Sequence, residues 1–134
     1  MSRLLTLLRP KAEAFSPLDI DGLQLWLDAA DTSTITESGG DVSQWDDKSG
    51  NDNHVSQATA ANQPATGTRT INGLNVLDFD GTNVLQAATT STWNFLHQSK
   101  YTIFIVLETD EGENTEAILQ TGTLSSADVG MTID

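Results

Sequence analysis

Three acidic side chains in one short segment are the first candidates for catalysis. Glu111, Glu113 and Glu116 stand in the pattern Glu-x-Glu-x-x-Glu. Retaining hydrolysis of a glycosidic bond needs two carboxyl groups on one face, about 5 Å apart. On a strand Glu111 and Glu113 would share a face, whereas Glu116 would not. The segment also follows the most apolar stretch of the chain, where a solvated loop is expected. We therefore predict that the protein has no catalytic residues and is not an enzyme.

A dense group of oxygen-bearing side chains offers a second kind of chemistry, calcium binding. The candidate ligands are Asp46, Asp47, Asn51 and Asn53. The segment differs from an EF-hand loop, because its glycine is misplaced and no glutamate closes it. The alternative is turn chemistry, in which Asp and Asn side chains bond nearby backbone N–H groups and Gly50 takes a positive φ. We favour the turn, keep calcium as the alternative, and expect no other cofactor.

Nucleophilic catalysis has little support in the sequence. The chain contains no cysteine, and His54 and His97 are its only histidines. Nothing places either histidine beside a serine, and neither a Gly-x-Ser-x-Gly motif nor a glycine-rich phosphate loop is present.

Aromatic side chains are the candidate sugar platforms, because an exposed indole can stack on the C–H face of a pyranose. Trp26 and Trp45 fall in expected strands, so we predict that they belong to the core. Trp93 lies in an irregular segment with Phe95. These two residues are the predicted carbohydrate-binding surface.

The elements that would position these residues are short strands separated by turn signals. Tyr101 to Glu108 is the clearest, with apolar residues on both faces, which predicts a central strand covered on both sides. Residues 29–41 and 56–70 read as loops, and Asp80-Gly81 as a hairpin turn that returns the chain at Val84 and Leu85. This pattern predicts an all-β sandwich. The other expected strands are 22–28, 42–45, 73–79, 117–120 and 129–133.

Charge divides the chain into two unequal parts. The 134 residues carry a net charge of −13 and suffice for one domain. Residues 1–11 hold three basic and no acidic side chains, whereas the remainder holds three basic and all 19 acidic ones. An acidic body repels nucleic acid and anionic membranes, so neither is an expected partner. No apolar run is long enough to span a bilayer.

The basic N-terminal arm is predicted to be a docking peptide. Its four leucines fit a short amphipathic helix that Pro10 ends. We expect the arm to be retained and to fold against a partner, although a frayed terminus is the alternative. The docking residues would be Arg3, Leu4, Leu5, Leu7, Leu8, Arg9 and Lys11.

Four segments in order resemble the N-terminal half of a concanavalin A-like lectin/glucanase domain of the laminin G-like kind. They are Gly22-Leu-Gln-Leu-Trp-Leu-Asp-Ala-Ala-Asp31, Trp45-Asp-Asp-Lys-Ser-Gly-Asn-Asp-Asn-His54, Asn72-Gly-Leu-Asn-Val-Leu-Asp-Phe-Asp-Gly-Thr-Asn83 and Tyr101-Thr-Ile-Phe-Ile-Val106. The resemblance covers residues 18 to about 134 and implies a jelly-roll β-sandwich. Glucanases of the wider superfamily use Glu-x-Asp-x-x-Glu, which the acidic segment at 111–116 resembles.

The resemblance implies a role in a virus particle. Such domains occur in tailed-phage head and tail appendages and in secreted bacterial proteins. We therefore expect a virion structural protein, a head decoration, head fibre or tail fibre, with an arm and linker at 1–17 and a sandwich at 18–134. Its expected partners are other virion proteins, host surface glycans and further copies of itself. An extracellular carbohydrate-binding module is the alternative, and a glycoside hydrolase a remote one. The family usually has more strands, so we expect a fragment or a domain completed by neighbours.

Overall fold

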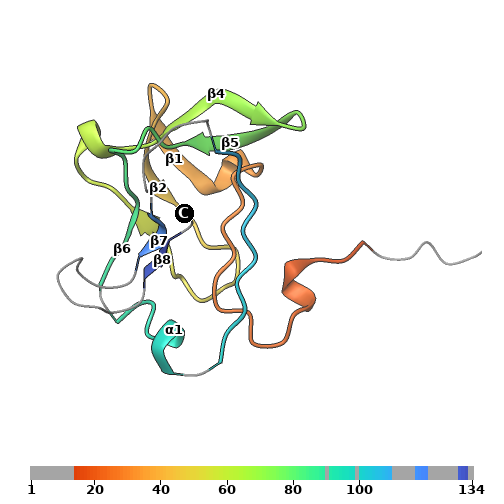
Figure 1. The fold of residues 1–134 in the computed structure, drawn as a ribbon. Helices are drawn as coiled ribbons and strands as arrows, with labels where there is room; N and C mark the ends of the chain where they lie inside the picture. The colour runs from red at the N-terminus through yellow and green to blue at the C-terminus, as the bar shows by residue number, and fades with distance from the viewer. Residues whose placement is uncertain (1–13, 90, 99, 110–116, 121–129, 133–134) are drawn as a thin grey trace, which may run out of the picture.

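The protein is mostly β-structure in antiparallel sheets, with few and short helices (Figure 1). The computed structural model describes residues 14–89, 91–98, 100–109, 117–120 and 130–132. Its strands are β1 (Ile35–Ser38), β2 (Asp41–Trp45), β3 (Val55–Ser56), β4 (Ala65–Ile71), β5 (Leu74–Asp78), β6 (Gln86–Ala87), β7 (Ala117–Gln120) and β8 (Gly130–Thr132). Three 3-10 helices, Pro17–Asp19, Thr32–Thr34 and Ala60–Asn62, and one short α-helix, α1 (Phe95–Gln98), complete the described elements. The expectation of an all-β protein is confirmed.

The larger sheet has six strands and is centred on β2. Its main path runs β5-β4-β2-β3-β6, and β1 pairs with β2 outside that path. Because β1 pairs along β2 from Trp45 to Asp41, β3 and β4 must share the other edge of β2. Among the described residues, the buried apolar side chains that mark the core are Val42 in β2, Val55 in β3 and Pro64 just before β4.

Two glycine-containing turns set the register of this sheet. Gly39-Gly40 joins β1 to β2, and Asn72-Gly73 joins β4 to β5. Both residues of each pair have positive φ, with values of 52° at Asn72 and 77° at Gly73. Positive φ at both central positions is what a type I′ hairpin turn requires, and Asn-Gly is the strongest sequence signal for it.

Two segments that the sequence predicts to be loops contain strands in the structure. The segments at 29–41 and 56–70 contain β1 and most of β4, which is the longest strand of the protein. The partner of β5 is β4, reached through Asn72-Gly73. The prediction that the chain reverses at Asp80-Gly81 to pair through Val84 and Leu85 is wrong, because the return strand β6 pairs with β3 instead.

The two most apolar expected strands lie outside the sheets. Residues 23–28 and 101–109 have no strand assignment, and Figure 1 draws both as plain traces without strand arrows. The prediction of a central strand covered on both sides at 101–108 is wrong. Phe104 is 84% exposed and Val106 is 92% exposed, whereas Ile103 and Ile105 on the opposite face are about 40% exposed. Among the described residues, no strand pairing includes this segment.

The C-terminal elements agree with the sequence. β7 has the expected bounds, and β8 falls inside the expected strand at 129–133. They pair antiparallel in a separate two-stranded sheet. Among the described residues, no helix is long and apolar enough to cross a membrane.

Candidate functional site

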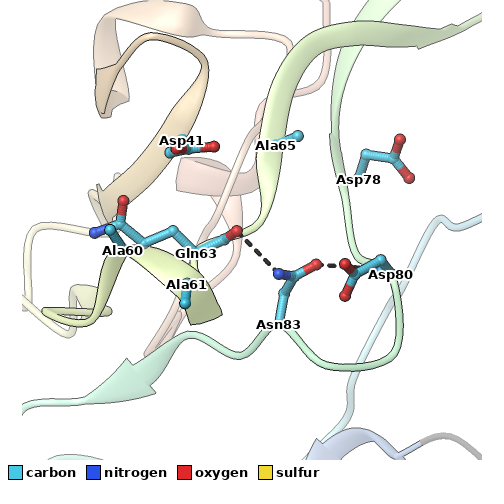
Figure 2. Close-up of a pocket in the computed structure, with 8 residues that line it drawn as sticks. All are labelled: Asp41, Ala60, Ala61, Gln63, Ala65, Asp78, Asp80 and Asn83. Atoms are coloured by element: carbon cyan, nitrogen blue, oxygen red, sulfur yellow. Dashed lines mark hydrogen bonds between the residues drawn. The ribbon is translucent and has the colours of Figure 1, made fainter.

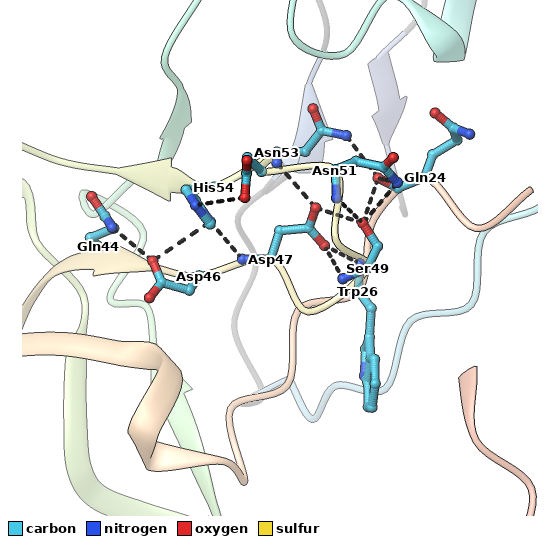
Figure 3. A network of polar contacts seen from close by, with 10 residues as sticks. Gln24, Trp26, Gln44, Asp46, Asp47, Ser49, Asn51, Asn53 and His54 are labelled. Carbon is cyan, nitrogen blue, oxygen red and sulfur yellow. Dashed lines mark hydrogen bonds and ion pairs between the residues drawn. The ribbon is translucent and has the colours of Figure 1, made fainter. Parts of the chain in front are cut away.

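The most elaborate polar site is centred on Asp47, which follows β2 (Figure 3). One carboxylate oxygen accepts the backbone N–H of Trp26 at 2.8 Å and that of Ser49 at 2.9 Å. The other oxygen accepts the Ser49 hydroxyl at 2.7 Å and the Asn53 backbone N–H at 3.1 Å. Asp47 is only 8% exposed. Its carboxylate is therefore fully used by protein donors.

These contacts also decide the charge state of Asp47. Burial alone would raise the pKa of its carboxyl, because a low dielectric disfavours the ionised form. The Ser49 hydroxyl and the three backbone N–H groups oppose burial and prevail, so the pKa lies below its ordinary value. Asp47 is thus a stable anion and a poor candidate for a general acid.

Asparagine side chains complete the same arrangement by binding backbone carbonyls. Asn53 donates from Nδ2 to the carbonyl of Gln24 at 2.7 Å, and Asn51 donates to that of Leu23 at 2.9 Å. The loop at 47–53 thus holds the segment at 23–26 by side chain to backbone bonds, in place of a strand ladder. We call this set of residues, Leu23, Gln24, Trp26, Asp47, Ser49, Asn51 and Asn53, the Asp47 clasp.

Lys48 connects Asp28 and Asp31 of the N-terminal segment to the loop at 47–53. Its Nζ lies 2.7 Å from Asp31 and 2.9 Å from Asp28, and 4.3 Å from the centre of the Trp26 ring. The hydrogen bonds that Lys48 donates to Asp31 and then to Asp28 raise the pKa of Lys48, and the Lys48 ammonium lowers the pKa of Asp31. The backbone N–H of Lys48 also donates to the Trp26 carbonyl at 2.8 Å.

His54 acts as an acceptor in this region. Its Nδ1 accepts the backbone N–H of Asp47 at 2.9 Å, so the neutral ring carries its proton on Nε2. That Nε2 lies 3.7 Å from a carboxylate oxygen of Asp52. No serine hydroxyl binds His54 among the described residues, and His97 lies apart in α1.

The structure brings the four candidate calcium ligands into one loop but gives them other partners. Asp47 accepts four bonds from the protein, and Asp46 accepts the Gln44 side-chain N–H at 2.7 Å. Asn51 and Asn53 point their amide nitrogens at carbonyls. Gly50 has φ 89°, as turn chemistry predicts. Within the described parts of the chain, no three His, Cys, Asp or Glu side chains are placed to hold a metal ion. These contacts favour the turn.

Asn75 of β5 connects the segment at 72–83 to the segment at 22–31. The sequence did not predict this role. The Nδ2 of Asn75 donates to the Ala29 carbonyl at 2.8 Å, and its Oδ1 accepts the Gly67 N–H at 3.1 Å. The available signal was a lone amide between the apolar residues Leu74 and Val76. Three of the four segments that carry the laminin G-like resemblance thus contact one another through polar side chains.

A shallow hollow of about 390 Å³ lies beside β2, β4 and the end of β5 (Figure 2). Three carboxylates, those of Asp41, Asp78 and Asp80, line it together with Asn83 and Gln63. Asp80 accepts the Thr82 backbone N–H and hydroxyl, which lower its pKa. Asp78 is paired with Arg69 at 3.3 Å. No aromatic ring lines the hollow, so it offers polar contacts without a stacking surface.

The aromatic candidates lie between core and surface. Trp93 and Phe95 contact each other with ring centroids 6.5 Å apart, and both are half-buried. The Nε1–H of Trp93 is buried with no acceptor among the described residues. Trp26 and Trp45 are also half-buried, so their expected full burial is only partly met.

Two sets of predicted residues lie outside the described part of the chain. They are the docking residues at 3–11 and the acidic segment at 111–116. Comparison of the chain with protein-family models, with curated proteins and with solved structures gives no match in any of the three.

Proposed function

We propose that the protein is a non-catalytic structural module of a phage particle, a head decoration or a head or tail fibre component. In this proposal residues 1–11 dock on the particle and the acidic β-body faces outward. A jelly-roll sandwich of the laminin G-like kind, completed by further strands, is the proposed architecture of that body.

The observation that carries the proposal is the use made of the polar residues. Among the described residues, Asp47, Lys48 and His54 are all engaged in bonds to backbone groups or to other side chains of the protein. A site built for catalysis leaves reactive groups directed into a cleft. The polar residues of this protein support the fold, which is what a display or scaffold module needs.

The distribution of charge supports a docking arm. Residues 1–11 contain three basic residues and four leucines, whereas the rest of the chain is strongly acidic. A short peptide of this kind suits an acidic, apolar groove on another protein. The rest of the molecule, with 19 acidic residues, suits a solvated exterior.

The test is incorporation of the protein into particles with and without residues 1–11. We expect the truncated protein to keep its circular dichroism spectrum and thermal transition, because the arm is proposed to fold against a partner and not to form part of the β-body. It should be missing from purified particles. Reversing only Arg3, Arg9 and Lys11 to Glu is the matched variant that tests charge while keeping the leucines. Normal incorporation of the truncated protein would overturn the proposal.

Carbohydrate binding is the second candidate, favoured by the contact between Trp93 and Phe95 in a partly exposed position. Such a surface would let a displayed module meet host glycans. Glycan-array binding that is lost in Trp93→Ala and retained in Trp26→Phe would support it. Absence of binding to any glycan would exclude it and leave the docking proposal unaffected.

A further inference from the structure

The segment from Lys100 to Glu108 is the most exposed apolar stretch among the described residues. It reads Lys-Tyr-Thr-Ile-Phe-Ile-Val-Leu-Glu and has no strand partner among the described residues. Its β-branched and aromatic residues strongly favour a paired strand. An unpaired apolar strand is normally protected, because its free N–H and C=O groups attract other strands. Something is therefore expected to pair with this segment.

The two faces of the segment differ in how far the protein covers them. Tyr101, Ile103, Ile105 and Leu107 share one face and are 37–52% exposed. Phe104 and Val106 on the other face are 84% and 92% exposed. One face thus rests partly against its own molecule, and the other is open to a partner.

The sequence of the segment is complementary to itself when two copies run antiparallel. With Phe104 opposite Phe104 of the second copy, Lys100 falls opposite Glu108 at both ends. Between them Tyr101 faces Leu107, Thr102 faces Val106, and Ile103 faces Ile105. A parallel arrangement would instead place lysine beside lysine and glutamate beside glutamate. Neither Lys100 nor Glu108 has an ion pair with a described residue, and both are exposed.

We propose that this segment is a homodimerisation strand. Two copies of the chain pair antiparallel through residues 100–108, about a two-fold axis at Phe104, with an ion pair between Lys100 and Glu108 at each end. Directly opposed residues in antiparallel strands have Cα atoms about 4.5–5.5 Å apart, so opposite charges and apolar pairs both contribute. The complementary end charges select a second copy over an unrelated strand. The contact is independent of the docking arm.

Cysteine cross-linking tests the register directly, because the chain has no cysteine of its own. Only residue 104 is opposite itself, so Phe104→Cys should form a disulfide-linked dimer under mild oxidation. Val106→Cys is the matched control on the same open face. Its two copies would lie about 13 Å apart along the strands, beyond the reach of a disulfide. A mixture of Thr102→Cys and Val106→Cys chains should cross-link, whereas each alone should not.

Charge exchange tests whether the ends meet as proposed. Lys100→Glu or Glu108→Lys places like charges opposite each other at both ends, and we expect either to raise the dimer dissociation constant roughly tenfold. The double variant restores opposite charges and should return the constant to near the wild-type value. The measurement is sedimentation equilibrium at fixed ionic strength. Neither position contacts the core, so circular dichroism should be unchanged in all three variants.

Three results would overturn the proposal. They are a monomer at all accessible concentrations, equal cross-linking of Phe104→Cys and Val106→Cys, and failure of the double charge variant to recover. If residues 100–108 paired with another segment or another protein instead, the chain would stay monomeric or the double charge variant would fail to recover. Because the truncated protein lacking residues 1–11 should still dimerise, failure of this proposal is distinguishable from failure of the docking proposal.

Discussion

Asp47, with Asn51 and Asn53, shows how a few side chains can take the place of a strand pairing. Segment 23–28 has no ladder, yet its backbone is held at Leu23, Gln24 and Trp26 by the Asp47 clasp. Hydrogen bonds to an ionised carboxylate are stronger than those between neutral groups. Residue identity at position 47 therefore determines the placement of a segment more than 20 residues earlier in the chain.

Replacing Asp47 with alanine should lower the free energy of unfolding by about 2–4 kcal/mol, because four donors in a buried position lose their acceptor. Urea unfolding followed by tryptophan fluorescence measures this change. Asp21→Ala is the control, since Asp21 is exposed and makes none of these contacts. It should change stability by less than about 0.5 kcal/mol. Equal effects of the two substitutions would show that the clasp does not stabilise the fold.

The pKa of Asp47 gives the protein an acid-dependent stability. The folded pKa lies below the ordinary value, so folding favours the ionised carboxylate. This contribution is complete above about pH 4 and is lost as the pH falls through the folded pKa. We expect the free energy of unfolding to fall below about pH 4, and less steeply in Ser49→Ala, which lacks the main hydrogen bond that lowers this pKa. A carboxyl titration by NMR should show a higher Asp47 midpoint in that variant, and an unchanged midpoint would contradict the assignment.

At the residue scale, the sequence identified the polar turn at 46–53. It did not show which distant backbone groups its side chains bind. Turn chemistry at 46–53 could be predicted from the residue types, and the positive φ of Gly50 follows that prediction. The long-range partners of Asp47, Asn51 and Asn75 could not be predicted, because the spacing of polar residues does not show which carbonyl an amide will reach.

At the scale of elements, the hairpin between β4 and β5 shows what local chemistry determines. Asn72-Gly73 has the signature of a type I′ turn, and the two flanking strands pair in register at Ile71 and Leu74. The signal was present in the sequence, but the polar, threonine-rich β4 beside it resembles a loop. β4 forms because β2 and β5 supply its neighbours, and that support is not local.

Substitution of Gly73 tests the turn. A Cβ at this position would meet nothing within 4 Å, so the cost of Gly73→Ala comes only from φ 77°. We expect a loss of about 1 kcal/mol in Gly73→Ala and a smaller loss in Gly73→Asn, because asparagine tolerates the left-handed region. Thermal unfolding measures both. Equal losses in the two variants would show that backbone strain is not the cause.

The expected strand at 101–108 shows the converse limit. Its composition predicts a buried strand, yet no described strand pairs with it. The periodicity of a segment predicts that it forms a strand. It does not show which other strand pairs with it, or whether that strand belongs to the same chain. The same reasoning explains segment 23–28, whose alternating leucines predict a ladder, while polar side chains hold it instead.

For the whole molecule, composition and turn signals sufficed to predict an all-β protein. The layered arrangement of a sandwich depends on long-range pairing, so the larger sheet with β2 at its centre could not be predicted. The separation of a basic arm from an acidic body is a property of sequence alone, and it remains the main support for the docking proposal.

The Asp47 clasp also has a consequence for the order of folding. Its donors and acceptors come from segments separated by 21–29 residues, and the loop at 47–53 lies between β2 and β3, which pair with each other. Loop closure over that distance is entropically unfavourable until such a framework exists. Residues 23–31 are therefore expected to attach late, as the last step that converts a formed sheet into the native protein.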